Sequence, residues 1–401
     1  MISISEHINK SFNRLSESEY QIQNIWQSSE YDWPGDWEGR ALLAFVCLYE
    51  VTGKKIDCMD KMMDLLPEHL NELGYMGKIC PDGKIDEQQL SSHSWLLRGL
   101  CEYYKVFNDE RALKFAKNIV DNLFLPGKKL YENYPTDRKT SNDGDVSGNL
   151  SGEISGWLLS TDVGCAYMCI DGLSEYYLHT NDSNVKNMLD DLIERFLNTD
   201  KIRMKVQTHA TLSATRGIIK LYKKTENKYY LENAINLFDF YVENGMTLTF
   251  ENFNWFDRFD TWTEPCCIVD SFIIASELYK ITNNDQYLSM MRKIWFNGLS
   301  FCHRDNGGAG PNKCVTNEQR TIKIHKYEAM YCCTMRYCEG LVFFKENENL
   351  LVHDASKQPE TDNYGRTFVD DCLVVKDKNS CEHFLCELAF VENDNTIEYY
   401  I

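Results

Sequence analysis

Two short clusters of cysteine carry the strongest chemical signal in this sequence. They are Glu264-Pro265-Cys266-Cys267 and Cys332-Cys333. A carboxylate and thiols that meet in space make the closed tetrahedral site that Zn²⁺ prefers, and the metal would keep those thiols deprotonated. The other interpretation is that these cysteines are small hydrophobic core residues, because free cysteine is among the most buried residue types. The spacing alone leaves both interpretations open.

A second candidate segment, residues 250–262, places acids among aromatic rings. It contains four Phe and two Trp beside Glu251, Asp257 and Asp260. Aromatic faces stack on the C–H surfaces of sugars, which suggests Trp255 as a binding residue, and burial beside rings raises the pKa of a carboxyl group, as a general acid requires. We expect Glu251 to be the acid, ahead of the two aspartates. The alternative is a loop that its aromatic residues merely anchor.

Several other polar residues fall where helices are expected to begin. His93 and His209 are candidate sugar-binding residues, and either could instead be a core or capping histidine. Gln207 precedes His209 by two positions and is a further candidate for sugar binding. Asp162 could bind substrate, and it equally fits a helix N-cap.

The elements that must position these residues are helices in repeated hairpins. From about residue 37 to 345 apolar residues recur at helical spacing, and a tyrosine near a helix end is repeatedly followed by a short polar turn and a second helix. About twelve helices result, and we predict an all-α fold, an (α/α)6 barrel. The aligned tyrosines are Tyr49, Tyr104, Tyr177, Tyr222 and Tyr279.

This topology would gather the candidate residues at one end of the barrel. If each hairpin has its short turn at one end, the long connections 127–160, 245–263 and 303–327 emerge at the other, and long loops carry sites. We predict a barrel over residues 1–345 and a short β-rich segment over 346–401. Its expected strands are Arg366 to Lys376, His383 to Val391 and Thr396 to Ile401.

Composition and charge narrow the class of protein. The 401 residues carry a formal charge of −19, which argues against nucleic acid and anionic membranes as partners. The 16 cysteines, about 4% of the chain, are too few for a disulfide scaffold. Met1 to Leu15 is polar and no run is long enough to span a membrane, so we expect no signal peptide, a cytoplasmic protein and reduced thiols. The sequence leaves open whether the chain is a monomer or a homo-oligomer.

The order of the motifs resembles the β-L-arabinofuranosidases of glycoside hydrolase family 127 and their relatives. The matching pieces run over roughly residues 90 to 345, with a weaker match at Trp37-Glu38-Gly39-Arg40. They are Ser92-His93, His209-Ala210, Glu243-Asn244-Gly245-Met246, Glu264-Pro265-Cys266, Asn297-Gly298-Leu299 and Cys332-Cys333.

The resemblance implies a fold, a metal and a reaction. It implies an (α/α)6 barrel with zinc held by Glu264, Cys266, Cys332 and Cys333. Cys332 would be the nucleophile of a retaining glycosidase that acts on a terminal sugar such as β-L-arabinofuranose, with Glu251 as acid/base. His93 and His209 would hold sugar hydroxyls.

Three other hypotheses stay open on the sequence. One is a metal-free sugar epimerase or isomerase that uses His93 and His209 for proton transfer. Another is a non-catalytic zinc-stabilised toroid that binds glycans or peptides. The third is a toroid like the lanthionine cyclases, with zinc on Cys302-His303, although Arg304 follows here where those proteins have glycine.

Overall fold

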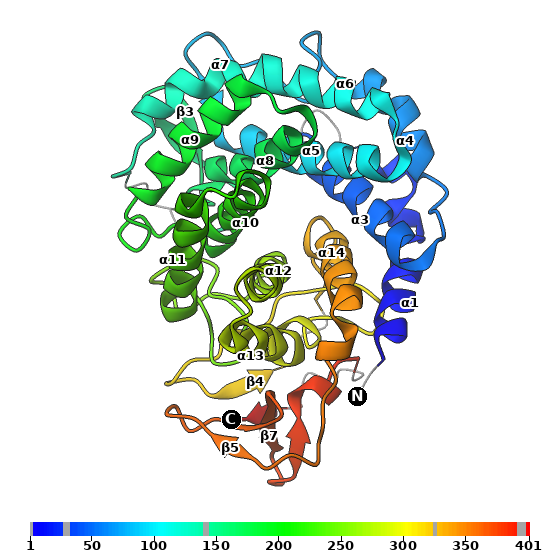
Figure 1. Ribbon diagram of the computed structural model, residues 1–401, viewed down its shortest axis with the longest axis vertical. Coiled ribbons are helices and arrows are strands. Elements are labelled where there is room, and N and C mark those ends of the chain that lie inside the picture. Colours follow the sequence, from blue (N-terminus) through cyan, green and yellow to red (C-terminus); the bar gives the residue numbers. More distant parts are fainter. Residues whose placement is uncertain (1–2, 27–32, 139–143, 324–326, 391–397) are drawn as a thin grey trace.

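The computed structural model confirms the predicted barrel. It describes residues 3–26, 33–138, 144–323, 327–390 and 398–401. Six inner helices stand around a central axis, each in contact with the next, and the last one packs against the first and so closes the ring (Figure 1). The inner helices are α3 (Asp36–Thr52), α5 (Glu87–Phe107), α8 (Cys169–Thr180), α10 (Thr208–Thr225), α12 (Pro265–Thr282) and α14 (Cys333–Glu346).

A second layer of helices surrounds this ring. Two short helical pieces, α2 (Ile22–Ile25) and α7 (Leu125–Gly127), lie in the connections. None of the helices that the structure describes has the length and apolar character needed to span a bilayer. The outer helices are α1 (Ile4–Leu15), α4 (Met59–Leu65), α6 (Glu110–Ile119), α9 (Ser183–Leu197), α11 (Lys228–Asn244) and α13 (Asp285–Ile294).

The predicted hairpin turns share one backbone geometry. Five inner helices end at a residue in the left-handed conformation, whose backbone N–H bonds to the carbonyl of the residue four positions earlier. That acceptor is in each case one of the five aligned tyrosines. In four hairpins the next residue then caps the outer helix with its side chain, so a two-residue turn ends one helix and begins the next. The capping residues are Asp109, Asp182, Asn227 and Asn284.

Glycines allow the inner helices to approach one another closely. A Cβ atom at Gly39 would lie 2.3 Å from the backbone nitrogen of Leu96, and one at Gly99 would lie 2.6 Å from the carbonyl oxygen of Gly39. Real side chains do not tolerate such contacts, so α3 and α5 can adopt this spacing only with glycine at both positions. This close packing sets where the first turns of the two helices lie around the lumen.

The C-terminal strands form a sheet that also takes in a strand from the barrel. The strands pair in the order β4, β9, β7, β6, β5, and β8 also pairs with β7. Strand β4 belongs to the long connection 303–327 and not to the C-terminal segment. The strand prediction did not include it. The predicted ends at Val391 and Thr396 lie outside the described residues. The strands are β4 (Thr321–Lys323), β5 (Glu360–Thr361), β6 (Thr367–Val369), β7 (Cys372–Asp377), β8 (Glu382–Phe384) and β9 (Glu398–Tyr400).

The connection 127–160 also contains strands that the sequence did not predict. Here β2 (Leu150–Ile154) and β3 (Trp157–Ser160) pair antiparallel, and β1 (Ile85–Asp86) joins β3 in parallel. This small sheet places the end of β3 next to the start of α5. It therefore brings the connection 127–160 to the rim of the barrel at which α5 begins.

A buried pair of histidines fastens α1 to the ring. The Nδ1 atoms of His7 and His303 lie 2.8 Å apart, and the hydroxyl of Tyr337 on α14 lies 3.0 Å from His7 Nδ1. Burial, with a smaller contribution from Lys10, lowers the pKa of His7 from 6.5 to about 3. His7 is therefore neutral in the folded protein at neutral pH.

Acid should weaken the protein through His7. Its pKa is lower in the folded than in the unfolded chain, so the stability that neutral His7 contributes is present above pH 6.5 and is lost as the pH falls. Between pH 6.5 and 5 the loss is about 2 kcal/mol. We expect His7→Asn, which keeps a polar atom near the Nδ1 position but does not titrate, to lose less stability over that range. Urea unfolding at pH 6.5 and pH 5 measures the free energy of unfolding of both proteins. If His7→Asn loses as much stability between the two pH values as the wild type does, the prediction is wrong.

Candidate metal and sugar site

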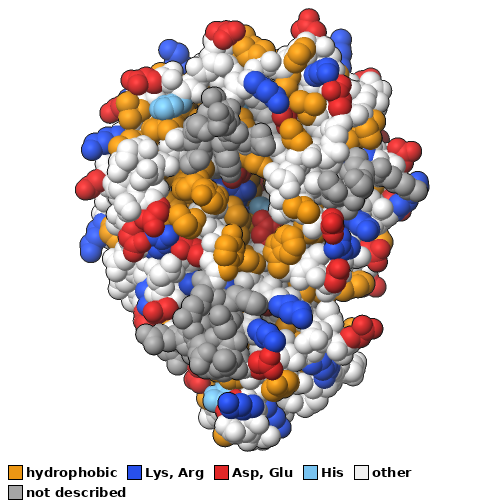
Figure 2. Space-filling view, turned by 180° about the vertical axis from the view of Figure 1, so that it is seen from behind, with side chains coloured by type: hydrophobic (Ala, Val, Ile, Leu, Met, Phe, Trp, Pro, Cys, Tyr) orange, Lys and Arg blue, Asp and Glu red, His pale blue; other side chains and the backbone are white. Residues whose placement is uncertain are grey.

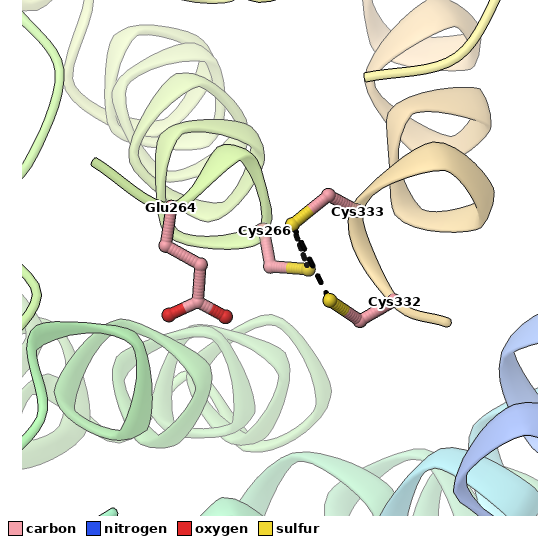
Figure 3. Close-up of side chains that lie close together, drawn as sticks. All are labelled: Glu264, Cys266, Cys332 and Cys333. Carbon is pink, nitrogen blue, oxygen red and sulfur yellow. Dashed lines mark hydrogen bonds between the residues drawn. The ribbon is translucent and has the colours of Figure 1, made fainter. Parts of the chain in front are cut away.

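The carboxylate and three thiols predicted from the sequence meet at the starts of two neighbouring inner helices. Glu264 is the residue before α12 and Cys266 lies in its first turn, while Cys332 and Cys333 begin α14. Figure 3 shows the three sulfur atoms pointing toward one another with the carboxylate beside them. One donor atom from each of the four residues lies within 4.8 Å of the other three.

The distances in this cluster suit a tetrahedral metal site. The sulfur of Cys333 lies 3.5 Å from that of Cys266 and 3.4 Å from that of Cys332. Thiolates bound to one Zn²⁺ at about 2.3 Å would lie about 3.8 Å apart, so small movements accommodate the ion. One oxygen and three sulfur donors also match the ligand types that zinc selects. The residues present therefore fit zinc.

Positive groups next to the cluster offset its negative charge. Arg40 Nη1 lies 3.6 Å from the sulfur of Cys266, and His209 Nδ1 lies 3.0 Å from Glu264 Oε1. Burial lowers the pKa of His209, but the carboxylates of Glu264 and Asp270 raise it overall to about 9, so the ring is a cation that donates to Glu264. Hydrogen bonds from Cys266 and Cys333, together with Arg40 and His209, hold the pKa of Cys332 well below its ordinary value.

Arg40 is itself fixed in place by α3 and α5. Its Nε lies 2.9 Å from both carboxylate oxygens of Asp36, one turn earlier, and its guanidinium stacks 4.0 Å from the ring of Trp95. The other neighbours of that ring are Arg336, at 4.5 Å, and His209, whose ring is 5.7 Å away. Neither Asp36 nor Trp95 is among the site residues expected from the sequence. The weak match at Trp37 to Arg40 is the one sequence signal that pointed to Arg40.

Gln207 and Asp162, two of the predicted sugar-binding residues, lie on the side of Glu264 away from His209. Gln207 Nε2 lies 3.4 Å from Glu264 Oε2 and 3.2 Å from Asp162 Oδ1. Asn254, with its amide oriented to satisfy both of its polar atoms, donates to Glu264 Oε2 at 3.1 Å. The interpretation of Asp162 as a helix N-cap is wrong, since its carboxylate instead accepts from Ser147 Oγ and Gly148 N–H.

Glu251 is held deep in the connection that precedes α12. Its two oxygens accept hydrogen bonds from Asn312 and Thr263 on one side and from Thr249 on the other. Burial raises its pKa to about 7, although these hydrogen bonds act in the opposite direction. Phe250 directly before it has a φ of +61°, which is unusual for a bulky residue and marks a tight turn. The carboxyl group thus has the pKa that a residue alternating between acid and base needs.

Two other candidates are placed where sugar contact is not expected. His93 accepts from Met76 N–H through Nε2, and its Nδ1 bonds to the carbonyl of Gln89, so backbone groups occupy both ring nitrogens. Trp255 is fully buried, and Trp262 packs on it edge to face at 5.5 Å. In this conformation neither ring presents surface to a ligand. Trp262, at 37% exposed, is the more accessible of these two tryptophans.

The cluster lies at an end of the barrel that is hollowed and ringed by apolar side chains. Figure 2 shows a central hollow with hydrophobic side chains around its mouth and charged and histidine side chains at its floor. Cys332 is partly exposed, whereas Cys266 and Cys333 are buried. Exposed aromatic residues of the connections at this end include Tyr327 and Tyr331. The site therefore offers an accessible sulfur at the base of an aromatic mouth.

Comparison with known proteins identifies the fold. No protein-family model matches the chain, and no curated protein matches its sequence significantly. Among solved structures, a family 127 β-arabinofuranosidase superposes with a TM-score of 0.57 at 12% identity; the match covers 93% of this chain and 63% of that one.

Two other similar structures match this chain over nearly their whole length. Cellobiose 2-epimerase from Bacillus thermoamylovorans gives a TM-score of 0.54 at 15% identity, over 86% of this chain and all of that one. An unsaturated glucuronyl hydrolase specific for heparin gives 0.57 at 12% identity, over 87% and 98% of the two chains. The chain has the (α/α)6-barrel fold that these glycosidases and epimerases share.

Proposed function

We propose that this protein is a retaining glycoside hydrolase that removes a terminal sugar such as β-L-arabinofuranose. The observation that carries the proposal is the cluster of Glu264, Cys266, Cys332 and Cys333 at the base of the aromatic mouth. The resemblance of the motifs to family 127 and the shared barrel fold support it. In this proposal the four residues hold zinc, and Cys332 is the nucleophile.

Each catalytic step can be assigned to a residue of this chain. When bound, zinc would keep the cysteine ligands ionised at neutral pH. The sulfur of Cys332 attacks the anomeric carbon as the bond to the leaving oxygen breaks, and Glu251 gives its proton to that oxygen. Glu251 then takes a proton from water, which attacks the same carbon and breaks its bond to sulfur. The two displacements retain the configuration of the sugar.

The charges and polar groups around the cluster suit a neutral sugar. Arg40 and the His209 cation offset the charge of the four ligands, so neither of these two cations is free to recruit an acidic substrate. Gln207 and Asp162 lie next to Glu264 and supply an amide and a carboxylate for sugar hydroxyls. Burial and the nearby charge of Glu264 raise the pKa of Asp162 to about 7, so this carboxyl group can donate or accept.

Metal analysis tests the proposal directly. We expect one zinc per chain, and we expect a chelator to abolish turnover and lower the melting temperature. Cys266→Ala should lose the metal, whereas Cys267→Ala should retain it, because the sulfur of Cys267 lies 3.4 Å from Thr208 Oγ1 and outside the cluster. Absence of zinc from the wild-type protein, or equal zinc in both variants, would contradict the proposal.

The competing functions make different predictions. An epimerase with His93 and His209 as proton carriers would survive chelation, and the backbone bonds to both nitrogens of His93 weigh against it. A non-catalytic toroid would lose stability on chelation and cleave no glycoside. Zinc on Cys302 and His303 is disfavoured, because the thiol bonds to the Leu299 carbonyl and the imidazole to His7.

A further inference from the structure

A second pocket lies outside the barrel lumen, where the end of α11 meets the C-terminal sheet. Its volume is about 510 Å³, within the range of small-ligand sites. The walls come from the end of α11, the turn 246–250, the segment 315–318 and the turn that carries Tyr364 and Arg366. Neither Glu251 nor any residue of the cysteine cluster lines it.

Two aromatic rings in this pocket are open to solvent. Phe259 is 55% exposed and Tyr364 is 57% exposed, and both line the pocket. The guanidinium of Arg366 supports Tyr364, because it stacks 5.3 Å from that ring and 4.7 Å from Phe250. Phe259 rests edge-on against Phe253 at 5.0 Å. Exposed, supported rings of this kind offer flat apolar surfaces on which a sugar ring can stack.

The polar groups of the pocket select for a neutral, hydroxylated ligand. Glu243, Asn317 and Glu318 are exposed, and no hydrogen bond or ion pair links their side chains to another residue in the described part of the chain. Of the described residues that line the pocket, Arg366 alone is a cation, and Asp362 offsets its charge at 2.8 Å. Among the described residues, the carboxylates of Glu243 and Glu318 have no counter-charge, so an anionic ligand would be repelled, whereas sugar hydroxyls can donate to them.

The pocket is built on the outer side of the turn that holds Glu251. Thr247 and Phe250 line it, and the same turn is closed by a hydrogen bond from Phe250 N–H to the Thr247 carbonyl. Leu248 joins this turn to the pocket walls, because its N–H bonds to the carbonyl of Val315 and its carbonyl accepts from Arg366. We propose that this pocket is a second carbohydrate-binding site, which takes a neutral oligosaccharide by stacking on Phe259 and Tyr364. It goes beyond the proposed activity, since it needs neither Cys332 nor Glu251.

Methyl NMR of the full chain tests this site, because Met246 and Met290 line the pocket. With ¹³C-methyl methionine, their two signals, assigned by Met→Leu variants, are followed during titration with cellohexaose, xylohexaose, mannohexaose and arabinohexaose. We expect at least one of these neutral probes to shift both signals saturably. Tyr364→Ala and Phe259→Ala should each weaken that binding by about tenfold or more, and Tyr229→Ala, an exposed tyrosine on α11, should not.

The outcomes separate this site from the catalytic centre. Failure of all four neutral probes to shift the two signals at millimolar concentration would overturn the proposal. So would a shift caused only by anionic hexagalacturonate, or unchanged affinity in the Tyr364→Ala protein. The same titration of the Cys332→Ser protein should match the wild type, and this holds whether or not the wild type proves to be a glycosidase.

Discussion

Replacement of Cys332 by serine is expected to reduce glycoside turnover by about 10³-fold or more. Serine keeps the shape of the side chain, but its hydroxyl stays protonated at neutral pH where the thiol ionises. Hydrogen bonds from its two cysteine neighbours and the charges of Arg40 and His209 favour that ionised sulfur. A hydroxyl at the same position therefore cannot supply the attacking electron pair.

The measurement is turnover of aryl glycosides, with 4-nitrophenyl β-L-arabinofuranoside as the first substrate. Metal content must be measured alongside, because Cys332 is also a proposed ligand. Cys267→Ser is the matched control: this buried cysteine also stands at the start of an inner helix but contacts Thr208 and not the cluster, so turnover should persist. Mass spectrometry of quenched wild-type enzyme should find one sugar residue on Cys332. Full turnover of a metal-containing Cys332→Ser protein would rule out the proposed nucleophile.

Replacement of Glu251 by glutamine is expected to lower turnover by about 10²- to 10⁴-fold. Glutamine is close in size and keeps polar atoms for Thr249, Thr263 and Asn312, so the loop should survive. What it lacks is the proton that the leaving oxygen needs. Substrates whose leaving group is a weak base, such as 4-nitrophenolate, need little protonation of the leaving oxygen. Their cleavage should therefore be reduced least.

The pH profile gives an independent check on Glu251. As an acid it must be protonated for the first step, and its pKa of about 7 predicts that kcat/KM falls as the pH rises through 7. In Glu251→Gln this limb should vanish. Asp257→Asn is the control: this exposed acid lies six positions later in the same connection and should keep both the activity and the limb. If Asp257→Asn loses the limb and Glu251→Gln keeps it, the acid/base assignment is wrong.

The barrel could be predicted from the sequence because its signals are local. A tyrosine near a helix end, a residue that adopts the left-handed conformation and a capping Asp or Asn lie within six positions of one another, as in Tyr104, Asn108 and Asp109. Such turns depend on the backbone preferences of neighbouring residues, so they can be recognised without the rest of the fold. The barrel in turn predicts that Glu264 and Cys266 meet Cys332 and Cys333, because consecutive inner helices begin at the same rim.

What the sequence could not decide is which side of each inner helix faces the lumen. His93 and Trp95 are two positions apart on α5, which places them about 200° apart around the helix. The packing of α5 against α3 through Gly39 and Gly99 places Trp95 beside Arg40, while His93 bonds to backbone groups.

The surroundings of the cluster likewise depend on contacts between distant segments. Arg40 reaches Cys266 across 226 residues of chain, and Asp162 turns to Gln207 instead of capping a helix. The burial of Trp255 and the pairing of β4 with β9 also depend on contacts between residues far apart in the sequence. The sequence by itself thus determined the helical hairpins and the residues of the cluster. Only the tertiary structure decided which side chains surround that cluster, because closure of the ring sets the rotation of every inner helix.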